Sequence, residues 1–134
     1  MITAYFDGGS RGNPGLAGWG AYIVDDDGTV LAELSGALGV ATNNVAEYTG
    51  LIAALQWAAD RDLTALAVKG DSLLIVEQMR GNYKVKNEGL KPLHMKARML
   101  VMQIGNVSFA HVPRENNKHA DRLSNIGMDA NGRG

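Results

Sequence analysis

The 134-residue sequence contains no cysteine, which excludes disulfide bonds and thiolate metal sites. Apolar runs are short, and none reaches the roughly 18 residues of a membrane span. The opening MITAYFDGG carries no basic segment leading into a long apolar one, and internal repeats are missing. With 46% hydrophobic residues the sequence suits a single packed domain. We therefore expect one cytoplasmic domain, residues 1–129, with residues 130–134 as a disordered tail and no membrane contact.

The net charge of −1 hides an uneven distribution of charge. Eight acidic residues and two arginines occupy residues 1–62, whereas residues 79–114 carry seven basic residues and one acid, Glu88. Such a confined basic region is typical of a nucleic-acid contact. A solvated helix face would show the same pattern, so both interpretations stay open.

Hydrophobic periodicity predicts a mixed α/β chain. The expected strands are residues 2–6, two strands within 18–38 joined at Asp27-Gly28, 64–70 and 106–112, and the expected helices are 43–62, 71–81, 90–105 and 115–130. In the first helix, Tyr48, Leu51, Ile52, Leu55 and Ala59 form one apolar stripe facing the sheet. Met95, Met99 and Met102 recur at helical spacing and are predicted to be core residues. His94 and His111 have no partner at metal-ligand spacing, and a structural role is predicted for both.

Three acidic residues are predicted to converge at one edge of the sheet. A strand that follows a helix returns beside an earlier strand in a right-handed crossover, so 64–70 should lie parallel to 2–6. Asp7 and Asp71 would then end neighbouring strands, with Glu47 near the start of the first helix. Each acid also has a local explanation: Glu47 in a capping box with Asn44, Asp71 as an N-cap, and Asp121 on a charged surface. Crowded carboxylates repel one another unless cations lie between them, and oxygen ligands suit Mg²⁺ or Mn²⁺. The three acids therefore predict a metal site that acts on a phosphate group.

Four segments carry a family resemblance. DGGSRGNPG, TNNVAEYTGLIAAL, GDSLLIVEQMRGNYKVKN and VPRENNKHADRLSN together resemble type 1 ribonuclease H, in its short prokaryotic form lacking the basic protrusion. The resemblance implies a ribonuclease H-like α/β fold, with a five-stranded mixed sheet (three antiparallel strands, then two parallel) and flanking helices. It also implies a metal-dependent endoribonuclease that hydrolyses the RNA strand of RNA–DNA hybrids to 5′-phosphate and 3′-hydroxyl products. The family's metal-binding carboxylates correspond to Asp7, Glu47, Asp71 and Asp121, which would hold two Mg²⁺ ions during catalysis, with Mn²⁺ as a substitute.

The same resemblance implies contacts with the hybrid. The residues expected to make them are Gly8, Asn13, Thr42, Asn43, Asn44, Tyr83, Lys84 and Lys86. Turn formation and helix capping would also explain the asparagines and Thr42, and burial in the core would also explain Tyr83. Arg114 or His119 would replace the family's loop histidine in product release, with Arg114 preferred. Leu73 stands where the family commonly has a glutamine, which removes one expected minor-groove contact.

Two other functions are compatible with this fold. A non-catalytic module could bind hybrids or double-stranded RNA, although such a module gains nothing from four acids facing phosphate. A DNA-directed nuclease or transposase-like enzyme is the other alternative, which the TNN segment and the short length disfavour. We expect a monomer that needs no protein partner.

Overall fold

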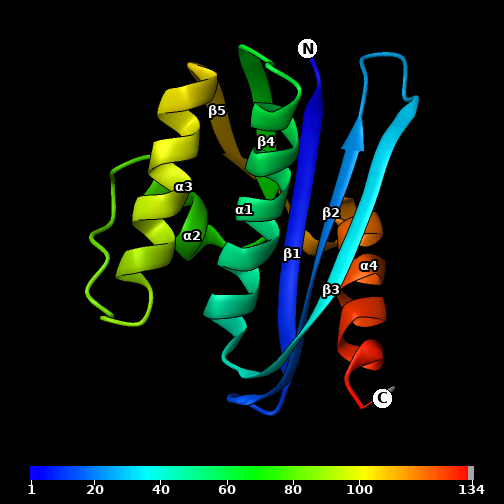
Figure 1. Cartoon of the computed structure of the whole chain (residues 1–134), viewed down its shortest axis with the longest axis vertical. Coiled ribbons are helices and arrows are strands. Elements are labelled where there is room, and N and C mark those ends of the chain that lie inside the picture. Colours follow the sequence, from blue (N-terminus) through cyan, green and yellow to red (C-terminus); the bar gives the residue numbers. More distant parts are fainter. Residues whose placement is uncertain (133–134) are drawn as a thin grey trace.

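The computed structural model describes residues 1–132, which form one sheet with helices on both faces (Figure 1). The elements in chain order are β1 (Thr3–Arg11), β2 (Gly15–Val24), β3 (Val30–Ala41), α1 (Asn43–Asp60), β4 (Ala65–Gly70), α2 (Leu73–Met79), α3 (Lys91–Ile104), β5 (Asn106–His111), the 3₁₀ turn η1 (Arg114–Asn116) and α4 (Lys118–Ala130). This order confirms the predicted succession of strands and helices, with η1 as an addition.

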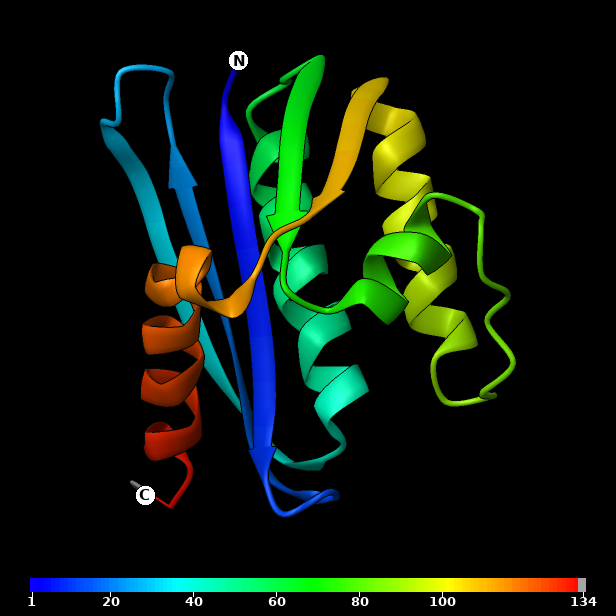
Figure 2. The ribbon, with the colours of Figure 1, turned by 180° about the vertical axis from the view of Figure 1, so that it is seen from behind.

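The sheet has the strand order β3-β2-β1-β4-β5. β1 pairs antiparallel with β2, and β2 with β3, whereas β4 lies parallel to both β1 and β5. The predicted parallel return of β4 beside β1 is therefore confirmed. Helices α1 and α3 lie in front of the sheet in Figure 1, and α4 lies in front of it when the molecule is turned in Figure 2.

The main core lies between the sheet and α1, α2 and α3. Ala4 and Phe6 of β1 alternate with less buried neighbours, as the period of a strand requires. Leu66 and Val68 do the same in β4. The predicted stripe of α1, from Tyr48 to Ala59, is buried in the same core, and its predicted packing is confirmed.

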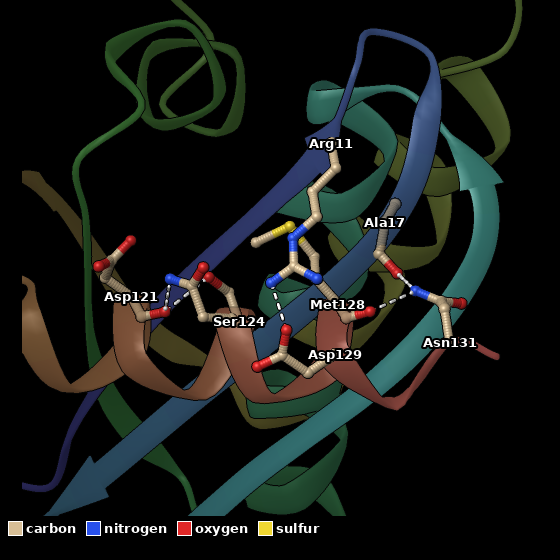
Figure 3. A network of polar contacts seen from close by, with 8 residues as sticks. Arg11, Ala17, Asp121, Ser124, Met128, Asp129 and Asn131 are labelled. Atoms are coloured by element: carbon tan, nitrogen blue, oxygen red, sulfur yellow. Dashed lines mark hydrogen bonds and ion pairs between the residues drawn. The ribbon is translucent and has the colours of Figure 1, made fainter. Parts of the chain in front are cut away.

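Two further sequence predictions concern the chain's ends and membranes. α4 ends at Ala130, and Asn131 donates from Nδ2 to the carbonyl of Ala17 at 2.7 Å (Figure 3). The ordered chain thus continues past the predicted boundary at residue 129, while residues 133 and 134 lie outside the described residues. Within residues 1–132, no helix combines the length and apolarity needed to cross a bilayer.

The exposed face of α3 departs from the prediction. Met95, Met99 and Met102 are 64–78% exposed, so their assignment to the core is wrong. The helix buries Ala97, Leu100 and Ile104 instead, while the three methionines line an open groove between α3 and the loop that follows α2. Helical spacing alone does not say which of two partly apolar stripes is covered.

Candidate active site

Asp7 lies where strand β1 loses one of its two neighbours. The parallel pairing of β1 with β4 ends at Phe6 opposite Gly70, and Asp71 follows at once. The prediction that the first strand covers residues 2–6 and ends at Asp7 is wrong, since β1 continues to Arg11 by pairing with β2. On the β4 side, β1 has no pairing partner at Asp7, because β4 ends at Gly70. Asp7 and Asp71 still lie close together, as predicted.

Glycines let helix α1 approach the strand closely enough to bring in Glu47. A Cβ on Gly8 would lie 2.2 Å from the carbonyl carbon of Ala46, and one on Gly50 would lie 2.5 Å from the carbonyl oxygen of Asp7. Only residues without a side chain allow this contact between two backbones. The structure thus gives Gly8 an intramolecular role, in addition to the expected approach to substrate.

The helix caps show that two of the acids are not capping groups. Thr42 caps α1 by accepting from the Val45 amide at 3.2 Å. Ser72 caps α2 by accepting from the Ile75 amide at 3.3 Å. The alternatives in which Asp71 is an N-cap and Glu47 belongs to a capping box with Asn44 are therefore wrong.

Asp7, Glu47 and Asp71 form a compact acidic cluster. One carboxylate oxygen from each lies within 4.8 Å of the other two. Asp7 is 6% exposed and Glu47 is 8% exposed. Oxygen Oε2 of Glu47 is buried and has no hydrogen-bond partner among residues 1–132. A buried carboxylate oxygen without a donor is costly, and a divalent cation would satisfy it, so the donor set fits a hard metal ion.

The cluster changes the acidity of its members. Burial, followed by the charge of Asp71, raises the pKa of Asp7 to about 7. Burial and the charges of Asp7 and Asp71 raise the pKa of Glu47 well above its usual range, while the Arg114 guanidinium partly opposes this. Both shifts have the direction expected of acids that are held together without a cation.

Asp121 stands at the rim of the same pocket. It lies in the first turn of α4 and is exposed, and its charge contributes to the raised pKa of Asp7. The pocket has a volume of about 300 Å³ and contains all four carboxylates predicted from the sequence. Ser124 donates to the backbone carbonyl of Asp121 at 2.8 Å and Asn125 at 2.9 Å, which fixes this turn of the helix (Figure 3).

Asn117 was not predicted from the sequence, yet it links two of the carboxylate-bearing elements. Its side chain is 1% exposed and donates from Nδ2 to the carbonyl oxygen of Phe6, the residue before Asp7, at 2.9 Å. Its own carbonyl accepts from the Asp121 amide at 3.0 Å. An asparagine before a helix is typical of a helix cap, so the sequence around Asn117 gave no signal of this long-range contact.

The β1–β2 turn is tied to the start of α1 through two predicted substrate contacts. The Asn13 side-chain oxygen accepts from the Asn43 amide at 3.1 Å, and the Asn43 side-chain oxygen accepts from the Ser10 amide at 2.8 Å. Asn43 also lines the carboxylate pocket. Thr42 is exposed and Asn44 is half-buried beside it. These residues therefore form one polar surface next to the acids.

Tyr83, Lys84 and Lys86 lie elsewhere, on the exposed loop between α2 and α3. Tyr83 is 46% exposed, so the alternative that places it in the core is wrong. With Lys84 it lines a groove of about 650 Å³ whose other wall is α3, including Lys91 and Arg98. Three residues of the predicted basic region, Lys84, Lys91 and Arg98, therefore line this groove, together with the exposed methionines of α3.

The two candidates for product release are separated. Arg114 lines the carboxylate pocket. The ring of His119 stacks on Tyr22, with centroids 4.2 Å apart, and lines a different pocket. His111, for which a structural role was predicted, places Nε2 3.2 Å from the backbone carbonyl oxygen of Asp71.

Comparison with known proteins identifies the family. A family described as reverse transcriptase-like matches residues 5–127. A bifunctional protein of Mycobacterium tuberculosis is 53% identical over 125 residues, which cover 92% of this chain. The chain spans only 34% of the length of that curated relative.

Two solved structures share the whole architecture. The N-terminal RNase H domain of a Mycobacterium tuberculosis protein, solved as a fusion with maltose binding protein, has a TM-score of 0.93 at 51% identity, covering 96% of this chain and 94% of that one. LC11-RNase H1, solved in complex with an RNA/DNA hybrid, has a TM-score of 0.91 at 45% identity, covering 96% of this chain and 97% of that one. With a matched family over most of its length and relatives of this identity and coverage, the chain belongs to the ribonuclease H family.

Proposed function

We propose that this protein is a metal-dependent endoribonuclease that hydrolyses the RNA strand of RNA–DNA hybrids, leaving 5′-phosphate and 3′-hydroxyl ends. The observation that carries the proposal is the convergence of Asp7, Glu47 and Asp71 within 4.8 Å, with Asp121 on the rim of their pocket. The LC11 enzyme that was solved with a hybrid is similar over nearly the whole chain, which supports the choice of substrate.

The acidic cluster is proposed to hold two Mg²⁺ ions, with Mn²⁺ as a substitute. All its donors are carboxylate oxygens, and the unpartnered Glu47 Oε2 is an available ligand. Divalent cations bound there supply water activation and stabilise charge on the leaving oxygen. The protein's own part is to orient the four acids through β1, α1, the end of β4 and α4, and to place Arg114 in the same pocket as Glu47.

Two surfaces are proposed to bind the hybrid. One is formed by the turn and helix start near the acids, and the other by the loop before α3. Their proposed substrate contacts are Gly8, Asn13, Thr42, Asn43 and Asn44 on the first surface and Tyr83, Lys84 and Lys86 on the second. The asparagines of the first surface recognise the sugars, since the 2′-hydroxyl distinguishes RNA from DNA. The lysines of the second surface neutralise phosphates.

Further parts of the proposal concern product release and organisation. Arg114, not His119, assists the departure of product, because only Arg114 lines the carboxylate pocket. The single domain proposed for residues 1–129 extends through Asn131, which is hydrogen-bonded to Ala17, and a monomer suffices because a single chain supplies all four acids. We place the activity in the cytoplasm.

The test compares labelled RNA–DNA hybrid, double-stranded RNA, double-stranded DNA and single-stranded RNA with Mg²⁺, Mn²⁺ or EDTA. We expect metal-dependent cleavage of the RNA strand of the hybrid. Asp71→Asn should abolish that cleavage while hybrid binding persists, because a carboxylate is lost next to phosphate but both surfaces remain. Asp62→Asn, an exposed acid outside the pocket, is the matched control.

Three outcomes would contradict the proposal. Hybrid binding without cleavage would favour the binding-module alternative, and cleavage of double-stranded DNA would favour a DNA-directed nuclease. Turnover of Asp71→Asn at the wild-type rate would refute the assignment of the carboxylates.

A further inference from the structure

A buried polar pair joins helix α1 to helix α2. Tyr48 is fully buried, and its hydroxyl donates to Oε1 of Gln78 at 2.6 Å. Gln78 is 5% exposed and belongs to the same helix as the fully buried Ile75 and Val76. Since either residue alone would leave a buried polar group unpaired, the contact fixes how α2 sits against α1.

Gln78 also contacts the loop that follows α2. The side-chain Nε2 of Gln78 lies 3.5 Å from the carbonyl oxygen of Lys84. The backbone carbonyl of Gln78 accepts from the Gly81 amide at 3.2 Å. The same carbonyl lies 3.4 Å from Nε2 of His94 on α3. Among the hydrogen bonds of residues 1–132, the contact to the Lys84 carbonyl is the one that joins segment 84–86 to α2, and Val85 of the same segment packs against the core.

This polar chain connects the acidic cluster to the basic groove. Tyr48 directly follows Glu47, a member of the cluster, in the first turns of α1. Gln78, Tyr83 and Lys84 line the groove between the loop and α3. A hybrid that contacts both surfaces requires a fixed distance between the acids and Lys84. The contacts of Gln78 to Tyr48 and to the Lys84 carbonyl help to fix that distance.

We propose that Gln78 is a positioning residue for hybrid binding, which sets Lys84 relative to the acidic cluster through Tyr48. The inference rests on the proposed function, because it assumes that the groove holds the hybrid. An apolar residue at position 78 could fill the core equally well. The Gln78 amide differs from an apolar side chain in making two polar contacts, one to Tyr48 of α1 and one to Lys84 of the loop.

The experiment separates positioning from stability with two variants. Gln78→Met conserves volume but removes both side-chain contacts and leaves the Tyr48 hydroxyl unpaired. The double variant Tyr48→Phe/Gln78→Met removes that unpaired group, so it should recover thermal stability without recovering the contact to Lys84. Thr49→Val is the matched control, since its hydroxyl donates within α1 to the Val45 carbonyl and makes no contact with the loop.

In the double variant we expect KM for the hybrid to rise by about three- to tenfold with kcat within about twofold of wild type, because binding is lost more than chemistry. The Mg²⁺ midpoint should not move, and amide hydrogen exchange of residues 82–86 should accelerate. Thr49→Val should change none of these. Wild-type KM and loop exchange in a stably folded double variant would overturn the proposal, as would a KM that recovers together with the melting temperature.

The readouts distinguish this inference from the proposed function. If wild type does not cleave the hybrid, the proposed function fails, while faster loop exchange in the double variant still supports the anchoring of the loop by Gln78. If wild type cleaves and the variants behave as wild type, only the positioning role of Gln78 is refuted. Should Gln78→Met fail to fold, the double variant still tests the loss of the contact to Lys84, and Tyr48→Phe, which keeps that contact, tests the loss of the Tyr48 hydroxyl alone.

Discussion

Neutralising Asp7 is expected to abolish cleavage and, at the same time, to stabilise the metal-free protein. Asp7 is almost fully buried beside Glu47 and Asp71, so its charge is unfavourable when no cation is bound. In Asp7→Asn the amide keeps the shape of the side chain, and its NH₂ group can donate to the neighbouring carboxylates. The repulsion is therefore removed without leaving a cavity.

The size of the effect follows from the shift in acidity. Burial, with the Asp71 charge, raises the pKa of Asp7 from 3.8 to about 7. At about 1.4 kcal/mol per pKa unit, the full shift corresponds to an upper bound of about 4 kcal/mol. Because the neighbouring acids titrate together with Asp7, we expect about half of this, roughly 2 kcal/mol, or about 8 °C in melting temperature for a domain of this size.

The pH dependence gives a second signature with a definite sign. The folded state binds the Asp7 proton more tightly than the unfolded state, so this group's contribution to stability is lost as pH rises from about 4 to about 7. The amide in Asp7→Asn does not titrate, so the variant does not lose stability through this group over this pH range. The stability advantage of the variant should therefore be small near pH 4 and largest at about pH 8 in EDTA.

Urea denaturation in EDTA across this pH range is the assay. Asp27→Asn is the control, because hydrogen bonds from Thr29 lower the pKa of this exposed acid, so its replacement should not stabilise the protein. Added Mg²⁺ should stabilise wild type more than Asp7→Asn, since the variant has lost a ligand. A metal-free Asp7→Asn that is no more stable than wild type at about pH 8 would refute the reasoning.

The remaining predictions concern substrate and support residues. Lys84→Ala with Lys86→Ala should raise KM more than it lowers kcat and should reduce the salt slope of hybrid binding by about one phosphate contact per lysine; an unchanged slope would mean a solvated face. Asn44→Ala should lower kcat/KM on hybrids by roughly 1–2 kcal/mol with an unchanged Mg²⁺ midpoint, and a shifted midpoint alone would contradict a role in sugar recognition. Asn117→Ala should lower the free energy of unfolding by about 1–3 kcal/mol and raise the Mg²⁺ concentration needed for activity. The reason is that the Phe6 carbonyl loses its donor, so α4 loses a contact with β1. Unchanged metal dependence would make the role of Asn117 purely structural.

Local pattern was sufficient for much of the fold. The apolar stripe from Tyr48 to Ala59 predicted both helix α1 and its buried face, and the chirality of crossovers predicted that β4 returns parallel to β1. These features follow from side-chain period and backbone handedness, which depend only on neighbours along the chain. The motifs likewise indicated the four acids, and the structure brings them into one pocket.

Tertiary contacts decided what neighbours along the chain could not. Thr42 and Ser72, not Asn44 and Asp71, cap their helices, because several adjacent residues can cap and packing selects the one that fits. β1 continues through Asp7 to Arg11 because β2 keeps pairing with it. The contact between Asn117 and the Phe6 carbonyl joins residues 111 positions apart. The sequence by itself therefore determined which residues could form the acidic site, whereas the distances among them, and the raised pKa of Asp7 that results, exist only after β1, α1, β4 and α4 have packed together.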